Sequence, residues 1–456
     1  VDLPSVEVDM PEVNMPEVEV SAPEVEVAGP MTEAESMEID EKKGPVSFND
    51  DSPEGPINEE DIVMEGDDGF LPPDDDLRSL FRTSQQFNGR QPDIWVQITI
   101  PSEFQPIGRY NIGVTAGIES TAYPGDFIEG FNRMNMNLVS SEHSRKVALT
   151  TKYEKIDKST NKVVSVTQLE KPLEVLFEGL DLNTFFKKPT KTNILKDIPE
   201  EFCFLYTGHW LSGKLGEDRK NTGLMIKTFL ETFNTPSNKK PALILKTNHI
   251  DFSISDREQI LKNISNIRKS VSGNLPNIYL LHGELTNSEM NELNNDPKVK
   301  VFLNFTKGEG FGRPLLEGAI TGKPTIVSNW SGHIDFIKPE YNILIGGDLK
   351  KVHPSAANKW LIKESQWFNI DVEVANKAMK DIYKHYKDYF AKSRKQTQYI
   401  KDNWSIDKMT EKLNTLLPKI EAAPQTQSLK LPKLKKVNTE QTLPKLKLPK
   451  LKKITV

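Results

Sequence analysis

The sequence predicts an α/β protein with two domains, each built on a parallel sheet with helices on both faces. Three observations support this class. The chain has 456 residues, a length typical of two or three domains. From residue 94 onward, short apolar runs alternate with amphipathic stretches, as strands and helices do in parallel sheets. A second series of apolar runs starts at residues 202–207, so we expect the second sheet to begin there.

The predicted elements follow one another without long gaps. In the first domain, strands are expected at residues 94–100, 110–116 and 137–139, and helices at residues 77–87, 127–134 and 141–149. In the second, strands are expected at residues 202–207, 242–246, 278–281 and 299–305, and helices at residues 221–233 and 256–270. Residues 355–390 are predicted to be helical, and a last helix at residues 409–417 follows Trp404.

The two ends of the chain differ from the body in composition. Residues 1–77 contain 25 acidic residues against Lys42 and Lys43, whereas residues 424–456 contain nine lysines and one glutamate. Few aromatic side chains, many prolines and a large charge excess are typical of segments that cannot fold alone. We therefore expect disordered tails, acidic at residues 1–73 and basic at residues 418–456.

Both tails contain short repeats. The unit Pro-Glu-Val-Glu-Val occurs at residues 16–20 and 23–27, and Pro-Lys-Leu-Lys occurs at residues 432–435, 444–447 and 449–452. Both units alternate charged and apolar residues, so an acidic and a basic strand could pair through opposite charges. Such pairing could join the tails of one chain, two copies, or other proteins that carry these units. Two independent solvated tails are the alternative.

No segment is expected to enter a membrane or to hold a metal. The longest apolar runs fall short of the roughly 18 residues of a membrane span, and the N-terminus lacks the order of a signal peptide, so we expect a cytoplasmic protein. The lone Cys203 lies in an apolar run and is expected to be a buried strand residue. The acidic run at residues 74–76 follows two prolines, and solvation is its favoured role.

A glycine-rich stretch at residues 308–319 organises the second domain. It reads as a turn followed by a short helix, because Pro314 suits a first helical position and Gly322 a position just past the end. Gly310 and Gly312 would let an anion approach the backbone at the helix N-terminus, where the dipole favours negative charge.

Two carboxylates, Glu309 and Glu317, flank this expected anion site. Carboxylates beside a phosphate pocket are unfavourable unless they accept hydrogen bonds from hydroxyl groups. The pattern therefore favours a ligand that carries both phosphates and sugars. An ordinary helix start with two surface glutamates is the alternative.

The frame Glu-Gly-Phe-Gly, Glu-Gly-Ala and Gly-Lys-Pro around Glu309 and Glu317 resembles the paired-glutamate motif of the retaining GT-B glycosyltransferases of family four. Residues 175–185 are similar to the family's segment at the end of the first domain. Residues 204–229 are similar to the strand and phosphate-contacting loop that open the second. The likeness covers roughly residues 93–417.

The resemblance implies two Rossmann-like domains facing a cleft. The acceptor-side domain would span residues 74–187, the nucleotide-sugar domain residues 188–390, and a C-terminal segment at residues 391–417 would cross back. The family has one more strand–loop–helix unit before residue 94, where this chain has acidic sequence, so a shortened first domain is expected. Some viral enzymes of this shape glycosylate nucleic acid, which would make the location the host-cell cytoplasm.

The resemblance also implies a reaction and its residues. A sugar would pass from a nucleoside-diphosphate sugar to an unknown acceptor with retention of configuration and without a metal or other cofactor. Lys220 and Arg219 would neutralise the leaving diphosphate, Glu309 would hold a sugar hydroxyl, and Glu317 would accept from the ribose. Further donor-binding positions are Gly310, Phe311, Gly312, Gly208, His209, His282, Gly283, Ser331 and Gly332.

Several of these assignments have open alternatives. Lys220 and Arg219 can bind a diphosphate or form a solvated charge pair. The family commonly has Arg where this chain has His209, which leaves Arg219 as the available partner of Lys220. The turn at His282 can read the nucleobase or only connect two elements, and Ser331 can touch the donor or only cap a helix. On the acceptor side the candidates are Glu119 and His143, although a histidine near a helix start can also be a cap or a surface residue.

Two other classes of function stay open. The shortened first domain would suit a non-catalytic scaffold that acts through its tails. A nucleic-acid-modifying glycosyltransferase would need basic residues along the first domain's side of the cleft.

Overall fold

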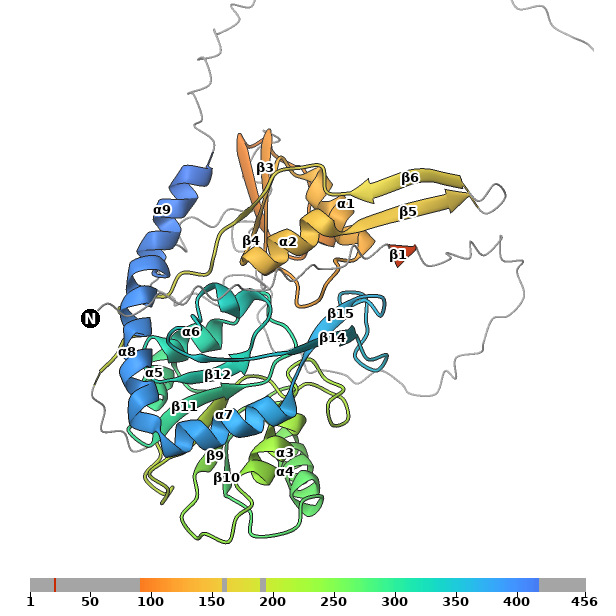
Figure 1. Ribbon diagram of the computed structural model, residues 1–456. Coiled ribbons are helices and arrows are strands. Elements are labelled where there is room, and N and C mark those ends of the chain that lie inside the picture. Colours follow the sequence, from red (N-terminus) through yellow and green to blue (C-terminus); the bar gives the residue numbers. More distant parts are fainter. Residues whose placement is uncertain (1–19, 22–90, 158–161, 189–193, 418–456) are drawn as a thin grey trace, which may run out of the picture. The chain divides into compact units, whose positions relative to one another are not determined.

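The chain is described from a computed structural model, in which residues 20–21, 91–157, 162–188 and 194–417 are placed (Figure 1). The expected helix at residues 77–87, the acidic run at residues 74–76 and nearly all of both tails lie outside the described residues. The α/β class and the two parallel sheets predicted from the sequence are confirmed.

The first sheet has four parallel strands in the order β2-β3-β4-β7. These strands are β2 (Ile94–Ile98), β3 (Tyr110–Thr115), β4 (Met136–Val139) and β7 (Leu173–Val175). Helices α1 (Gly125–Arg133) and α2 (Glu142–Thr150) pack on one face, where Phe127, Phe131 and Val147 join a buried core with Val139 of the sheet. Helices were expected on both faces, but α1 and α2 both lie on this one in the described residues, because the strands follow one another in one direction across the sheet and right-handed crossovers place each connecting helix on the same face.

The second sheet has six parallel strands in the order β10-β9-β8-β11-β12-β13. Its strands are β8 (Cys203–Thr207), β9 (Ala242–Lys246), β10 (Ile278–Leu281), β11 (Val299–Asn304), β12 (Thr325–Ser328) and β13 (Ile343–Ile345). The central strands are apolar and buried because helices cover them, among them α3 (Thr222–Thr232), α4 (Ile254–Lys269), α5 (Asn287–Asn295) and α6 (Arg313–Ala319). Cys203 is buried in β8 as expected.

The strand order reverses between β8 and β11. The chain runs outward from β8 through β9 to β10, then returns to start β11 on the other side of β8. The loops that leave two such strands diverge and open a crevice at the carboxyl edge of the sheet, which is where doubly wound sheets bind ligands. In this protein the loops at residues 208–221 and 305–312 border the switch point and touch each other there, since the Lys307 N–H donates to the Arg219 carbonyl at 2.8 Å.

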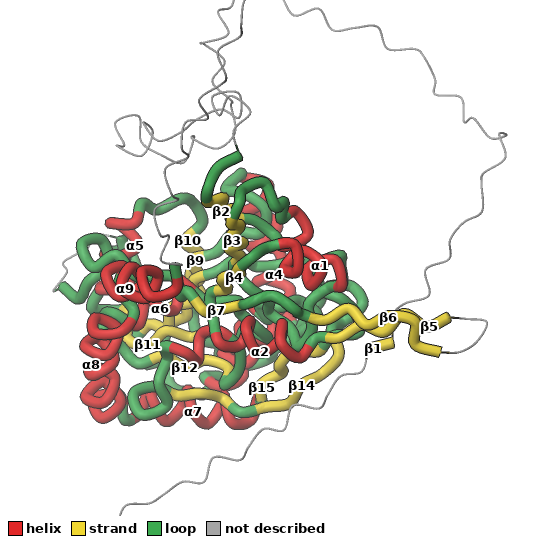
Figure 2. The backbone as a smooth tube through the Cα atoms, turned by 90° about the horizontal axis from the view of Figure 1, so that it is seen from above, coloured by secondary structure: helices red, strands yellow, loops and turns green. Residues whose placement is uncertain are grey.

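Two antiparallel hairpins were not predicted. Strands β5 (Lys152–Asp157) and β6 (Lys162–Gln168) form one, and it extends from the first domain (Figure 2). The other joins β14 (Gly347–Lys351) to β15 (Gln366–Ile370). Residues 355–390 were expected to be helical, and that prediction was wrong for residues 355–371, where turns and β15 are found. In β15 the buried Phe368 and Ile370 alternate with a polar residue, which is the period of a strand.

The C-terminal helices are α7 (Val372–Lys384), α8 (Tyr386–Asn403) and α9 (Ile406–Leu416). The turn between α8 and α9 joins the segment that follows the first sheet. Leu180 donates its N–H to the Trp404 carbonyl at 2.8 Å, and Ile406 donates to the Leu180 carbonyl at 3.0 Å. The Trp404 ring also packs on Phe177, at 4.7 Å between centroids. None of the helices in the described ranges combines the length and apolar character needed to cross a membrane.

Candidate functional site

The switch-point loop after β8 places two cations directly before helix α3. Asn221, which begins α3, has a left-handed backbone with φ of 57°. Its N–H donates to the buried carboxylate of Asp218 at 2.7 Å, and this bond fixes the turn. Residues 219 and 220 are held inside this turn, so their side chains leave the backbone at the start of the helix.

The three residues predicted for catalysis lie close together, and the acceptor-side candidate Glu119 joins them. Lys220 Nζ lies 2.7 Å and 2.8 Å from the two carboxylate oxygens of Glu309. Arg219 Nη1 donates to the Gly308 carbonyl at 2.7 Å and lies 3.5 Å from Glu309 Oε2. Arg219 Nη2 lies 3.2 Å from Glu119 Oε1, which comes from the loop after β3. Two cations and two carboxylates from both sheets therefore form one charged cluster, Glu119–Arg219–Lys220–Glu309.

Electrostatics fix Glu309 as an anion. Its side chain is 9% exposed, and burial by itself raises the pKa of this carboxyl. The charges of Lys220 and Arg219 outweigh burial and lower the pKa of Glu309 to about 2. Removing either cation would leave a buried charge without compensation.

The backbone around Glu309 is anchored by the loop after β12. Ser331 Oγ accepts the Glu309 N–H at 2.9 Å, and the Gly332 N–H donates to the Glu309 carbonyl at 2.9 Å. Ser331 makes no capping bond to the 3-10 helix η5 (Gly332–Asp335), so the capping interpretation was wrong. The hydroxyl accepts a hydrogen bond from Glu309 instead, so Ser331 and Gly332 lie next to the turn that carries Glu309.

The glycines of the turn allow close contact with the backbone of the first-domain loop. A Cβ on Gly308 would lie 2.0 Å from the Glu119 carbonyl, and a Cβ on Gly310 would lie 2.3 Å from the Ala116 carbonyl. The expectation that Gly310 leaves room for a diphosphate is corrected in this structure, because the first-domain loop occupies that space. Gly312 precedes α6 with φ of 96°, a conformation that favours glycine.

Phe311 was predicted to bind the donor, but its side chain is a core residue. It is 3% exposed and packs against Phe336 at 5.0 Å between ring centroids and against Trp404 at 6.1 Å. The ring therefore packs in the core beneath the glycine-rich turn. Any contact of Phe311 with a ligand would involve its backbone.

Glu317 belongs to a second carboxylate cluster, Glu178–Arg313–Glu317. Arg313 Nε donates to Glu317 Oε1 at 3.1 Å, one turn apart on α6. Burial raises the pKa of Glu317, and the charge of Glu178 raises it further against the influence of Arg313. Burial also raises the pKa of Glu178, and Glu309 adds to that shift. Glu178 belongs to the segment that resembles the family, but no role was predicted for it. Its position near Arg313 and Glu317 is evident only from the structure.

Two histidines lie close to the charged cluster. The His143 ring meets the edge of Trp330 at 4.6 Å, and burial lowers the pKa of His143 to about 3, so this imidazole is neutral. His333, which was not predicted, is fully buried and its Nε2 lies 2.8 Å from the Ser328 carbonyl. Burial lowers the pKa of His333 as well, and Gly312 packs against its Cβ.

The remaining predicted residues follow the carboxyl edge of the sheet away from the cluster. His209 and Gly208 follow β8; burial lowers the pKa of His209, and the nearby charge of Lys220 lowers it further. His282 Nε2 lies 2.9 Å from the buried carboxylate of Asp256. The Gly283 carbonyl accepts a hydrogen bond from Lys246 Nζ at 2.5 Å. Lys246 and Asp256 were missed, since neither stands in a motif.

This arrangement can neutralise an anionic ligand and accept hydrogen bonds from hydroxyl groups. Two cations stand at the switch point beside a carboxylate that stays ionised, and the carboxylates of the second cluster lie near it. Within the described ranges, no three His, Cys, Asp or Glu side chains are grouped so that they could hold a metal ion.

No family model and no curated protein matches the sequence. Several solved structures are similar to it. HepE from Anabaena, in complex with UDP and glucose, shares 10% identity over 73% of this chain and 72% of its own, with a TM-score of 0.45. Sucrose-phosphate synthase from Thermosynechococcus elongatus shares 11% identity over 71% of this chain and 72% of its own, with a TM-score of 0.47.

The pneumococcal O-GlcNAc transferase GtfA, in complex with UDP and GlcNAc, shares 14% identity over 67% of this chain and 52% of its own, with a TM-score of 0.41. Identities this low bear on fold alone, and the fold of this chain rests on its own strand order. By these comparisons the chain is similar in structure to glycosyltransferases.

Proposed function

We propose that the protein is a retaining glycosyltransferase that uses a nucleoside-diphosphate sugar. The observation that carries the proposal is the Glu119–Arg219–Lys220–Glu309 cluster at the switch point of the second sheet. Two cations at this edge suit a diphosphate, and a carboxylate held ionised beside them suits a sugar hydroxyl. The motif around Glu309 and Glu317 adds the family resemblance to this geometry.

In the proposed reaction, the bond between the anomeric carbon and the diphosphate oxygen breaks, and a bond to an acceptor oxygen forms on the same face. The diphosphate leaves with the electron pair, and its leaving oxygen takes up the proton that the acceptor hydroxyl loses. Lys220 and Arg219 stabilise the charge that grows on the leaving group, which is the largest contribution such a site can make. Both are already held within hydrogen-bond reach of Glu309, so they are oriented before the donor arrives.

The other roles follow from position. Glu309 holds a donor sugar hydroxyl, and Glu317 accepts from the ribose. The backbone at Gly312, Ser331 and Gly332 surrounds the donor, while the backbone at Gly208, His209 and His282 extends toward the base. Glu119 and the neutral His143 stand on the acceptor side, from the loop after β3 and the start of α2. The mechanism requires no metal.

The test is release of nucleoside diphosphate from a panel of UDP, GDP and ADP sugars, with and without simple sugar and peptide acceptors. We expect one base class to be consumed by the wild type and by Lys227→Ala, whose lysine pairs with Glu231 on α3 away from the cluster. Nuclear magnetic resonance of the new anomeric centre then tests retention. An inverted product would reject the retaining mechanism alone.

A non-catalytic role is the second candidate, and the close packing of Gly310 on the Ala116 carbonyl favours it. The first-domain loop would have to move before a donor could reach this part of the turn. Titration calorimetry separates the two candidates. Donor binding without turnover under any acceptor would support a scaffold, whereas absence of binding to every donor would reject both a transferase and a sugar-nucleotide sensor.

A further inference from the structure

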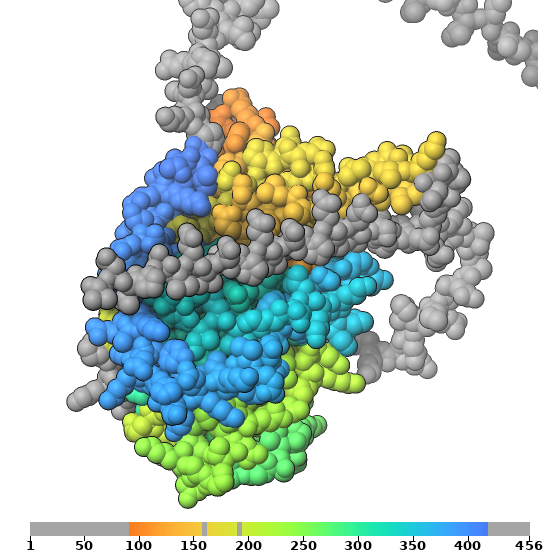
Figure 3. Space-filling view, viewed as in Figure 1, coloured from red at the N-terminus to blue at the C-terminus, as the bar shows by residue number. Residues whose placement is uncertain are grey.

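The β5–β6 hairpin leaves the first domain with an apolar face exposed. In its register Ile156 is opposite Val163, and Glu154 is opposite Val166. The three apolar side chains therefore share one face, and they are 41%, 49% and 46% exposed. In the space-filling view the hairpin forms a projection (Figure 3). A hairpin with exposed apolar residues is a template for another strand at its edge.

The outer edge of β5 is paired with β1 (Val20–Ser21) in the described chain. The pairing is parallel and places Val20 beside Tyr153 and Ser21 beside Glu154, so the order of the three strands is β1-β5-β6. Figure 1 shows β1 next to β5. Val20 is the last residue of the first Pro-Glu-Val-Glu-Val unit. The last residue of this unit is therefore paired with the hairpin through its backbone.

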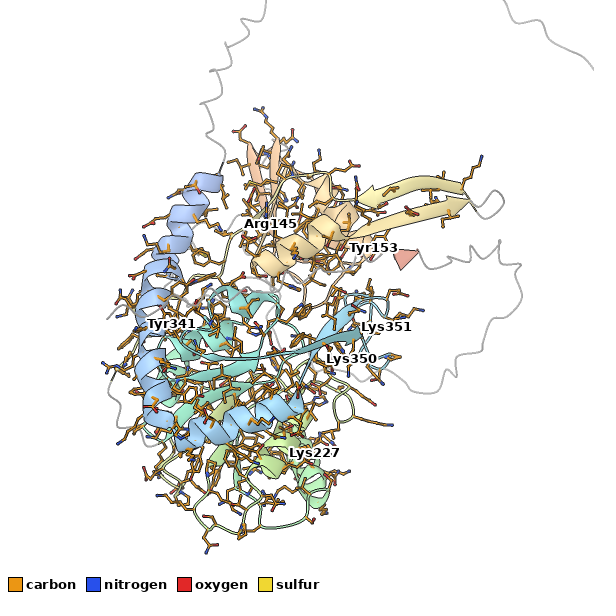
Figure 4. All side chains as sticks on the ribbon, viewed as in Figure 1. Arg145, Tyr153, Lys227, Tyr341, Lys350 and Lys351 are labelled. Atoms are coloured by element: carbon orange, nitrogen blue, oxygen red, sulfur yellow. The ribbon has the colours of Figure 1, made fainter. Side chains whose placement is uncertain are left out.

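Tyr153, the residue that pairs with Val20, is held by the first domain. Tyr153 lies at the base of the hairpin (Figure 4), its hydroxyl donates to the Tyr123 carbonyl, and its ring borders the first-domain core. A strand that pairs with Tyr153 is therefore anchored next to the first-domain core. Its pairing does not depend on the far end of the hairpin.

Charge distinguishes the two kinds of repeat. Continuing the β1–β5 register by one residue would set Glu19 opposite Lys152, and opposite charges across two strands stabilise the pair. A Pro-Lys-Leu-Lys unit in the same register would set a lysine against Lys152. The acidic repeat is therefore the better occupant of this edge.

The second acidic unit offers the same sequence seven residues later, at residues 23–27, so either unit can take the register of Val20. Prolines before each unit lack an N–H and confine the strand to about one unit. We propose that the β5 edge is a docking site for an extended strand, and that its occupant is the chain's own acidic repeat segment, residues 16–27. This site is independent of the switch-point chemistry.

The test is amide hydrogen exchange on the full chain. Glu19→Lys with Glu26→Lys should speed exchange in β5 at least tenfold and leave β8 unchanged, because like charges then face each other. Adding Lys152→Glu should restore protection. Glu38→Lys with Glu41→Lys, outside the repeats, is the matched control and should change nothing. Equal exchange of β5 in all four proteins would overturn the proposal.

Disulfide trapping identifies the occupant. Ser21→Cys with Glu154→Cys places thiols at registered positions, and the buried Cys203 does not compete, since burial raises the pKa of its thiol to about 12. Mild oxidation should give a cross-linked single chain. A cross-linked dimer would overturn the occupant in favour of a second copy. Faster β5 exchange after deletion of residues 424–456 would overturn it in favour of the basic tail.

Discussion

Glu309 and Glu317 lie in one short stretch of sequence, yet their surroundings shift the pKa values of the two carboxyls in opposite directions. Glu309 faces two cations, and its pKa falls to about 2 despite burial. Glu317 shares the single cation Arg313 with Glu178, and its pKa rises. Burial acts in the same direction on both, so the number of cations within reach decides the sign. Two glutamates that look equivalent in the motif therefore have pKa values that shift in opposite directions.

This difference suits two tasks. A carboxylate that stays ionised through the physiological range can orient a hydroxyl and balance the two cations permanently. A carboxylate with a raised pKa responds to what approaches it, because a new hydrogen-bond donor or cation favours its ionised form. We expect the fixed anion to matter most for the chemical step and the adjustable one for binding.

Lys220→Ala should have the largest effect on the comparison, because it removes the main reason why Glu309 is an anion. Leaving-group charge grows toward the transition state, so we expect kcat to fall by about 10²–10³-fold while donor affinity changes less. Steady-state kinetics measure this split. Loss of a buried partner should also lower the free energy of unfolding by about 3–5 kcal/mol.

Lys227→Ala serves as the control, because Lys227 forms only a partly exposed pair within α3. A Lys220→Ala protein that melts cooperatively at a temperature where it is assayed, yet changes only the Michaelis constant, would rule out the leaving-group role.

Glu317→Ala should act mainly on binding. A ribose left without its acceptor loses about 1–3 kcal/mol of binding free energy, or roughly 5- to 150-fold in Kd. Isothermal titration with UDP, GDP and ADP measures it. Thr167→Ala, on the β5–β6 hairpin, is a control that leaves the second domain untouched. Unchanged affinity for all three nucleotides would remove Glu317 from the site.

The cluster was predicted from the family resemblance more than from local signals. The spacing around Glu309 fits an ordinary helix start as well, and Arg219 and Lys220 alone would suggest a solvated charge pair. Glu119 was a candidate because the family often has an acidic residue or a histidine on the acceptor side, and it follows a predicted strand of the first sheet. Lys220 and Glu309 are 89 residues apart in the sequence. No local sequence pattern therefore shows that the lysine contacts both carboxylate oxygens.

Other features could not be reached for the same reason. Glu178 and Glu317 are remote in sequence, so their shared Arg313 appears only in the folded chain. The strand β15 lies in a stretch that was predicted to be helical, and its five residues are too few to show a clear period of two. The close approach of the Gly310 and Ala116 backbones depends on how the first-domain loop packs, which residue types do not specify.

Glu178→Gln should sharpen the comparison through pH. Donor affinity should fall as pH drops through the raised pKa of Glu317, since the protonated carboxyl accepts less well from the ribose. Removing the neighbouring charge lowers that pKa, so the loss of affinity should move to lower pH in the variant. Titrations of UDP binding between pH 4.5 and 8 follow this shift. Identical pH profiles would show that the two carboxylates are not coupled.

The smallest effect is expected at Asp335, a third carboxylate that is not paired with a cation at salt-bridge distance within the described residues. Burial raises its pKa to about 6, although its Oδ2 accepts the Glu142 N–H at 2.9 Å. The folded state binds this proton more tightly than the unfolded state, whose pKa is near 3.8, so ionised Asp335 weakens folding and its cost grows as pH rises between these values.

Asp335→Asn keeps an acceptor for Glu142 and removes the charge. Because Asp335 is only partly buried, we expect the free energy of unfolding to rise by about 1 kcal/mol at pH 7. The gain should disappear by pH 4, where the wild-type carboxyl is protonated in the folded state. Thermal unfolding at both pH values measures the difference, with Asp348→Asn on the exposed strand β14 as control. An equal gain at pH 4 and pH 7 would mean that the ionised carboxylate of Asp335 has no cost in the fold.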